Sequence, residues 1–388
     1  MISPTLRLCL PVVVVALAGT VALAADAGIP RPRSLILTGW DNPDTAQFAR
    51  DLHSLEGLPF DGVVLYANGK GADGAAFNTQ AAFGSNHWDE ACLDQARADL
   101  KGVHSNRLTE NFLIFGANPG SVDWFNDAGW REIQAHCRQL ARVARQGGLR
   151  GLLFDPENYT DPFKQFDYSR QARHAEHSFA DYCLKARQRG RETMEAIAGE
   201  FPDAVVLSYF LAGQCARRDN IRDVRPDLEA YWYGLLPAFL NGWLDRIPVT
   251  MTLVDGNESA YHYNSEAAFE AGFVRIKNAC LGLIEPENRP KYRAQVQAGH
   301  GIYLDGYIYP PDSKWYLDPQ GATRVKRLEE NVTHALDTAD RYVWIYGEHA
   351  RWWPPAQAGA KAPPTWPEAL AGIESALASA RHPAGAAK

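Results

Sequence analysis

Two acidic residues, Asp155 and Glu157, end an apolar stretch in the segment GLRGLLFDPENY, residues 148–159. Residues two apart in an extended chain point to the same side, about 6.6 Å apart along it. Carboxyl groups held this close oppose each other's ionisation, so one keeps its proton while the other is charged. The spacing therefore indicates acid catalysis. An isolated Asp-x-Glu more often caps a loop or pairs with an arginine, so the surrounding fold must decide.

Eight short runs rich in β-branched and aromatic residues predict eight strands. Each run is continuously apolar, as in strands covered on both faces of a parallel sheet, and helical periodicity fills most of the intervals. The predicted strands are 34–38, 62–66, 111–115, 151–154, 204–209, 248–254, 301–304 and 342–346, and the clearest helices are 130–145, 179–199, 228–244, 266–281 and 323–338.

This alternation predicts a fold of the α/β class, a single (β/α)8 TIM barrel with loop insertions. A last helix, marked by a capping box of Thr365 and Glu368, would complete the ring. An open doubly wound sheet is the alternative, but it normally has fewer strands and a glycine-rich first turn. The chain has neither a dinucleotide-binding nor a P-loop motif, so we predict no cofactor and expect the glycine-rich stretch 68–74 to be a loop.

Residues 1–24 have the pattern of a signal peptide. Arg7 precedes an apolar run, and Ala22-Leu23-Ala24 fits the small-x-small cleavage pattern. The run is shorter than the ~20 residues of a membrane span and contains Pro11, which disfavours an anchor. We expect a secreted or periplasmic protein, with the barrel over 25–381, a flexible tail over 382–388 and at least one unpaired thiol. The net charge of −7 disfavours nucleic acid or an anionic membrane as a partner.

At the end of the predicted fourth strand, the Asp155-x-Glu157 motif resembles that of (β/α)8 glycoside hydrolases such as family 18 chitinases and endo-N-acetylglucosaminidases. The resemblance implies that Glu157 is the general acid and that Asp155 orients an acetamido group of the substrate. The full chitinase signature is Asp-x-x-Asp-x-Asp-x-Glu, and here Arg150 and Leu153 replace its first two aspartates. A second protein carboxylate would then take the place of the acetamido group.

The carboxyl ends of the other predicted strands supply the remaining candidates, because function in a TIM barrel lies at that end. Glycoside hydrolysis needs a second carboxyl about 5.5 Å away for retention, or about 6.5–9.5 Å for inversion. The candidates are Asp255, Asp305 and Glu348, of which Glu348 is favoured because the fourth and eighth strands face each other. Each could instead be a turn residue or an ion-pair partner.

Aromatic side chains near the strand ends favour a sugar ligand, because flat rings stack on the apolar faces of sugars. Amides and carboxylates would bind the hydroxyls. Trp352 and Trp353 lie between polar residues and prolines, so we expect them to be exposed. The predicted substrate-binding residues are Trp40, Asn68, Asn118, Tyr159, Tyr209, Asp305, Tyr307, Trp352 and Trp353.

The sequence thus predicts a secreted glycoside hydrolase that acts on an oligo- or polysaccharide, with catalytic residues Glu157, Asp155, Glu348 and Asp255. No metal site belongs to this interpretation. Two alternatives stay open. One is a metal-dependent barrel that acts on sugars or phosphoesters, and the other is a barrel that binds glycans without catalysis.

Overall fold

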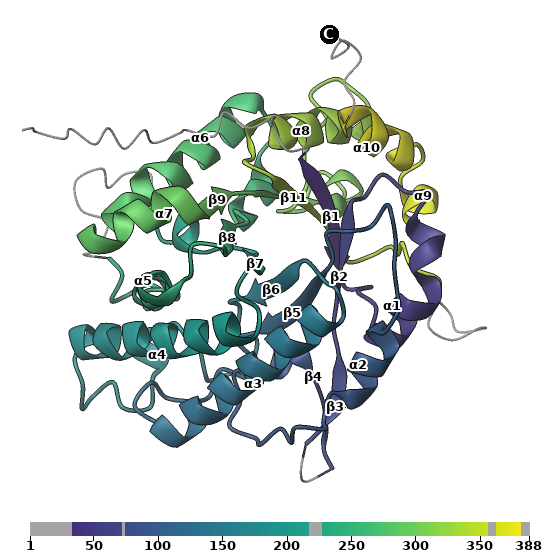
Figure 1. Cartoon of the computed structure of the whole chain (residues 1–388). Helices are drawn as coiled ribbons and strands as arrows, with labels where there is room; N and C mark the ends of the chain where they lie inside the picture. Colours follow the sequence, from purple (N-terminus) through teal and green to yellow (C-terminus); the bar gives the residue numbers. More distant parts are fainter. Residues whose placement is uncertain (1–32, 72–73, 217–226, 356–361, 382–388) are drawn as a thin grey trace, which may run out of the picture. The chain divides into compact units, whose positions relative to one another are not determined.

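A computed structural model describes residues 33–71, 74–216, 227–355 and 362–381 (Figure 1). The predicted signal peptide, residues 1–24, and the predicted tail, residues 382–388, lie outside the described residues. All five cysteines in the described part are free thiols. None of the helices described there is both long and apolar enough to cross a membrane.

Nine strands form the main sheet, in the order β10-β11-β1-β2-β5-β6-β7-β8-β9, and every pairing is parallel. The two strands at the ends of this order, β9 (Val296–Ala298) and β10 (His300–Tyr303), are separated in the chain only by Gly299. They are two halves of one barrel strand, because β9 pairs with β8 and β10 pairs with β11. The sheet therefore closes into eight strands. The others are β1 (Ser34–Gly39), β2 (Gly62–Leu65), β5 (Phe112–Gly116), β6 (Gly151–Asp155), β7 (Val205–Ser208), β8 (Thr252–Asp255) and β11 (Tyr342–Gly347).

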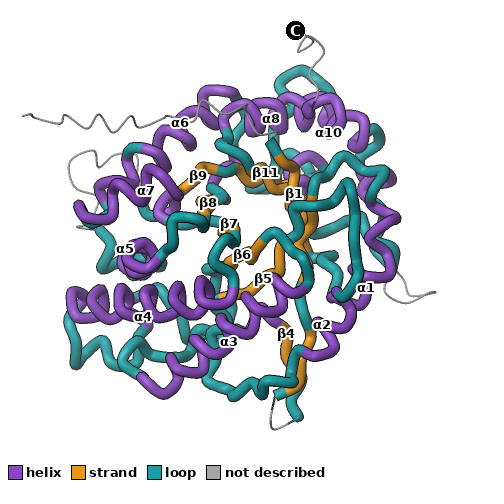
Figure 2. Tube along the Cα trace, viewed as in Figure 1, coloured by secondary structure: helices purple, strands orange, loops and turns teal. Residues whose placement is uncertain are grey.

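Helices surround this ring, with the strands inside (Figures 1 and 2). One helix follows each barrel strand, and the short helices α7 (Arg289–Gln295) and α9 (Trp366–Ala369) are additional. The predicted single α/β barrel is therefore confirmed, and the expected capping box is present at the start of α9. The eight main helices are α1 (Thr45–Asp51), α2 (Asp94–Leu100), α3 (Asp127–Gln146), α4 (Phe179–Glu200), α5 (Leu236–Arg246), α6 (Glu266–Lys277), α8 (Arg324–Thr338) and α10 (Ile373–Arg381).

Two boundaries and one predicted loop differ most from the prediction. Helix α5 begins at Leu236 instead of 228, and β8 begins at Thr252 instead of 248, because turns occupy the preceding residues. Within the glycine-rich stretch predicted as a loop, β3 (Asn68–Lys70) instead forms a strand that pairs antiparallel with β4 (Ala76–Asn78). Phe77 of β4 stacks on the buried Trp88 at 4.1 Å, which packs the hairpin against the core.

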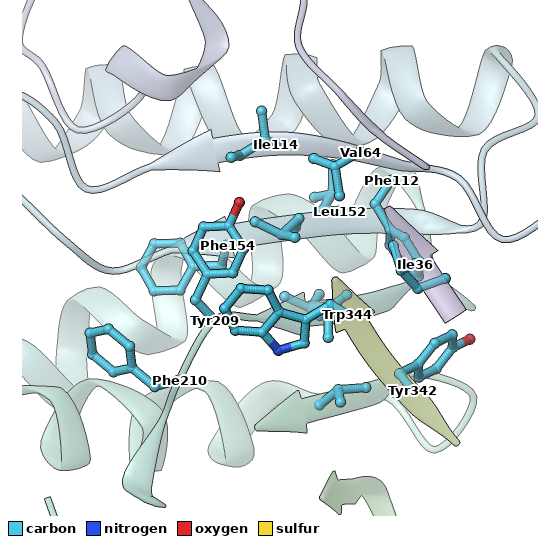
Figure 3. Close-up of a cluster of buried hydrophobic side chains, with 14 of the residues drawn as sticks. Ile36, Val64, Phe112, Ile114, Leu152, Phe154, Tyr209, Phe210, Tyr342 and Trp344 are labelled. Carbon is cyan, nitrogen blue, oxygen red and sulfur yellow. The ribbon is translucent and has the colours of Figure 1, made fainter. Parts of the chain in front are cut away.

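Aromatic side chains fill the interior of the barrel below its carboxyl end. Phe112 of β5 and Tyr342 of β11 meet edge to face at 5.7 Å, although β1 and β2 separate their strands in the sheet. Tyr209, just after β7, lies 4.6 Å from Trp344 of β11, again across the ring. Figure 3 shows these side chains together with buried residues of β1, β2 and β6. This packed layer is the floor of whatever site the strand ends form.

Two glycines, Gly190 of α4 and Gly242 of α5, let these helices approach closely. A Cβ at Gly190 would clash with the Phe239 carbonyl, whereas Gly199, on the same helix, has open space around it. We predict that Gly190→Ala lowers the free energy of unfolding by about 1–3 kcal/mol through overpacking. Gly199→Ala should raise it by about 0.4–1 kcal/mol, because alanine restricts the unfolded chain. Urea unfolding of both variants checks this, and equal effects would contradict the packing.

Candidate active site

A cavity of ≈ 660 Å³ opens where the barrel strands end, bordered by Gly39 at the end of β1, Asp155 at the end of β6 and Tyr303 at the end of β10. Among the described residues, four carboxyl groups line it: Asp155, Glu157, Glu258 and Glu348. Nine aromatic side chains complete most of the wall, and they are Trp40, Tyr66, Tyr159, Tyr209, Tyr261, Tyr303, Tyr309, Trp315 and Tyr346. Of the thirteen predicted site residues, the cavity brings together Asp155, Glu157, Glu348, Trp40, Tyr159 and Tyr209.

The end of β6 presents the Asp-x-Glu pair. Asp155 is the last residue of the strand and is buried, and its Oδ1 accepts a hydrogen bond of 2.9 Å from the Glu157 backbone N–H. The half-buried Glu157 accepts a hydrogen bond from the Tyr159 hydroxyl. Asn118 does not line the cavity, but its Oδ1 accepts from the Tyr159 backbone N–H at 3.0 Å. Tyr159 is thus held by one hydrogen bond at its backbone and another at its hydroxyl group.

Glu258, which follows β8, is a cavity residue absent from the predicted set. The residue before it, Asn257, has a left-handed backbone with φ of 49°, and its side chain is tied to Arg275 and His300. The Glu258 backbone N–H donates to the Tyr209 carbonyl at 3.1 Å. These contacts direct the Glu258 side chain to the cavity. Its sequence signal is its place just after the predicted strand 248–254, but the segment has the composition of a plain turn, so Glu258 is not among the predicted catalytic residues.

The carboxyl groups of the cavity disfavour one another's charge. Burial, and then the charges of Glu157 and Asp155, raise the pKa of Glu258 well above its ordinary value. Burial and the charge of Glu157 likewise raise the pKa of Asp155. Burial also raises the pKa of Glu157, although the Tyr159 hydrogen bond and the charge of Lys164 partly offset it. Groups coupled in this way share protons, so the cluster keeps its protons to a higher pH than isolated carboxyl groups would.

Glu348 lines the opposite part of the wall, just after β11. Burial raises its pKa, and a hydrogen bond from the Tyr303 hydroxyl acts in the other direction. Asp305, a predicted candidate for catalysis and binding, is fully buried outside the cavity. Its carboxylate accepts hydrogen bonds from the backbone N–H groups of Glu348 at 2.8 Å and His349 at 3.1 Å. Asp305 therefore positions Glu348 and has no direct access to a ligand in the cavity.

Asp255 and Tyr307 also lie outside the cavity. Asp255 is fully buried, and its carboxylate accepts from the backbone N–H groups of Gly213 at 2.7 Å and Asn257 at 3.3 Å. The Tyr307 hydroxyl is buried and accepts from Asn331 Nδ2 at 2.8 Å. Neither side chain can act on a substrate from its position. No group of three or more His, Cys, Asp and Glu side chains within the described ranges is placed to hold a metal ion.

The expected exposure of Trp352 and Trp353 is wrong. Trp352 packs edge to face on Phe60 at 5.1 Å, Trp353 lies 6.5 Å from Phe48, and both tryptophans are buried. Asn68 is exposed on β3, away from the cavity, and donates to Asp44 Oδ2 at 3.1 Å. These three predicted binding residues therefore form no part of the cavity wall. Trp40, by contrast, stands at the wall with 69% of its surface exposed.

The raised pKa of Asp155 gives a prediction about stability. Its ordinary value is 3.8, so the folded protein binds this proton more tightly than the unfolded chain does. The resulting stabilisation of the folded state is complete below pH 3.8 and is lost as the pH rises through the raised pKa of Asp155. We therefore expect Asp155→Asn to raise the free energy of unfolding at pH 8 by about 1 kcal/mol or more. The gain should shrink towards pH 4, as measured by urea unfolding at each pH.

Asp245 provides a control of opposite sign. Burial alone would raise its pKa, but hydrogen bonds from Arg187, Asn288 and Arg191 lower it to about 2, against an ordinary value of 3.8. Its stabilisation is present above pH 3.8 and is lost as the pH falls towards 2. Asp245→Asn should therefore cost about 2 kcal/mol at neutral pH. If Asp155→Asn and Asp245→Asn both destabilise the protein at pH 8, the raised pKa of Asp155 is contradicted.

Comparison with known proteins gives only distant similarities. Neither a family model nor a curated protein sequence matches the chain. A GH5-4 broad-specificity endoglucanase from an uncultured bacterium is 12% identical with a TM-score of 0.46, over 88% of this chain and 86% of that chain. D-psicose 3-epimerase from Clostridium cellulolyticum H10 is 11% identical with a TM-score of 0.39, over 90% and 96%. The GH18 chitinase ChiB of Flavobacterium johnsoniae is 8% identical with a TM-score of 0.34, over 90% and 94%. These values support no assignment of activity.

Proposed function

We propose that the protein hydrolyses a glycosidic bond in a neutral oligo- or polysaccharide. The observation that carries this proposal is a single cavity that combines four carboxyl groups with nine aromatic side chains. Aromatic rings supply flat apolar surfaces for sugar rings, and paired carboxyls supply the acid and the base or nucleophile of glycoside hydrolysis. Every ionisable side chain among the described lining residues is a carboxyl or a phenol, so the cavity repels an anionic substrate.

Glu157 is the general acid in this proposal. Burial keeps its proton to a higher pH than usual, and the Tyr159 hydroxyl fixes the orientation of its carboxyl group. Glu258 is the second catalytic carboxyl, because it lines the same cavity. Among the neighbouring charges, that of Glu157 raises the pKa of Glu258 most. Glu348, the carboxyl favoured by the sequence, then binds a sugar hydroxyl. Export remains a prediction, since it rests on residues 1–24.

The first prediction of this proposal concerns Glu157→Gln. The amide keeps the shape of the side chain but cannot supply a proton, so hydrolysis should fall by at least ~100-fold. Release of reducing ends from tetrasaccharides of glucose, mannose, xylose, galactose and N-acetylglucosamine measures this. Glu258→Gln should have an effect of similar size. Glu270→Gln, on the exposed face of α6, is the matched control and should leave the rate unchanged.

Three results would overturn the assignment. Near-wild-type hydrolysis by Glu157→Gln would exclude it as the acid. A complete loss of hydrolysis after exhaustive chelation, restored by a divalent ion, would favour a metal-dependent barrel. Binding of an oligosaccharide by the wild-type protein without any release of reducing ends would favour a barrel that only binds glycans.

A further inference from the structure

A second, smaller cavity of ≈ 180 Å³ adjoins the main one. The two cavities share Glu157 and Tyr159 in their walls. Lys164, Trp232 and Tyr233 line the smaller cavity and are absent from the lining of the main one. The carboxyl group that we propose as the acid therefore stands at the boundary between two separate spaces.

Trp232 is exposed at this smaller cavity. It is 70% exposed, whereas both of its neighbours in the chain pack against the core. The Tyr231 hydroxyl donates to the Gln214 carbonyl at 3.1 Å, and the Tyr233 ring lies 4.7 Å from Phe210. The anchored neighbours fix the backbone and leave the indole of Trp232 outward. The main cavity has a counterpart in Trp40, so an exposed indole borders each cavity.

The polar part of the smaller cavity is also held in place. Lys164 Nζ donates to the Asn158 carbonyl at 2.9 Å and lies 3.5 Å from Asp161 Oδ1. An ammonium group has three protons, so one is left to donate to a hydroxyl group in the cavity. The Leu235 backbone N–H donates to the Phe166 carbonyl at 3.0 Å, which joins the segment bearing Trp232 to the segment bearing Lys164. A backbone hydrogen bond therefore joins the two segments that line this cavity.

We propose that the smaller cavity is the subsite for the leaving-group sugar, which stacks on Trp232 while the attacked sugar occupies the main cavity. This inference rests on the proposed function. Glu157, between the two spaces, gives its proton to the glycosidic oxygen as the bond from that oxygen to the anomeric carbon breaks. The departing sugar leaves with the new hydroxyl. Water supplies the hydroxyl of the other product, and its remaining proton restores the carboxyl group.

A comparison of leaving groups tests the subsite. Fluoride is too small to fill the smaller cavity, so a glycosyl fluoride of the sugar that the enzyme cleaves makes no use of Trp232. Contacts to a remote part of the substrate are expressed in kcat/KM. Trp232→Ala should lower the ratio of kcat/KM for the oligosaccharide to that for the fluoride by about tenfold, the scale of one aromatic contact.

Two further variants make the comparison specific. Trp40→Ala should lower kcat/KM for both substrates and leave their ratio unchanged, because Trp40 borders the main cavity. Leu184→Ala removes another large apolar side chain that is 70% exposed, on α4, and should change neither value. A ratio that stays at the wild-type value in Trp232→Ala overturns the subsite but leaves the proposed function standing. Failure of the wild-type protein to hydrolyse any oligosaccharide or fluoride overturns both.

Discussion

Closure of the sheet at Gly299 determines where everything else can lie. At this residue the seventh barrel strand leaves β8 and joins β11, and a Cβ there would press on the Tyr342 carbonyl and on Val254. The Gly299 backbone N–H donates to the Asp255 carbonyl at 2.8 Å, so the join is also hydrogen-bonded to β8. A parallel sheet that closes in this way gathers all its carboxyl ends around one opening. Carboxyl groups far apart in the sequence therefore share a single cavity.

A common arrangement holds these acidic side chains in place. The buried Asp155 accepts a hydrogen bond from the backbone of Glu157, and the buried Asp305 accepts one from the backbone of Glu348. Asp255 accepts from the residue just before Glu258. In each case an aspartate inside the barrel fixes the loop whose glutamate faces the cavity. Asp305 and Asp255 do not line the cavity, and they act as positioning residues for Glu348 and Glu258.

The sequence was informative wherever local patterns decide the structure. Continuous apolar runs specified the strands, and the position of Asp155 and Glu157 at the end of one run placed them at the carboxyl end of the barrel. The sequence was misleading where contacts distant in the chain decide burial. Trp352 is covered by Phe60, almost 300 residues earlier, and no local pattern reports that contact. The catalytic candidates did not include Glu258 for a similar reason, because Asn257, which sets its direction, owes its conformation to Arg275 and His300.

The acidic cavity also explains how stability is distributed in this fold. Buried carboxyl groups that oppose one another's ionisation reduce the stability of the folded state at neutral pH. Asp245, which does not line the cavity, is held by Arg187 at 2.8 Å and Arg191 at 3.1 Å, in an ion-pair group that joins α4 to α5. There the pKa is lowered, so neutral pH favours the folded state. Within the cavity, the same burial raises the pKa of Glu157, so the feature that weakens the empty protein also keeps the proposed acid in its protonated, proton-donating form to a higher pH.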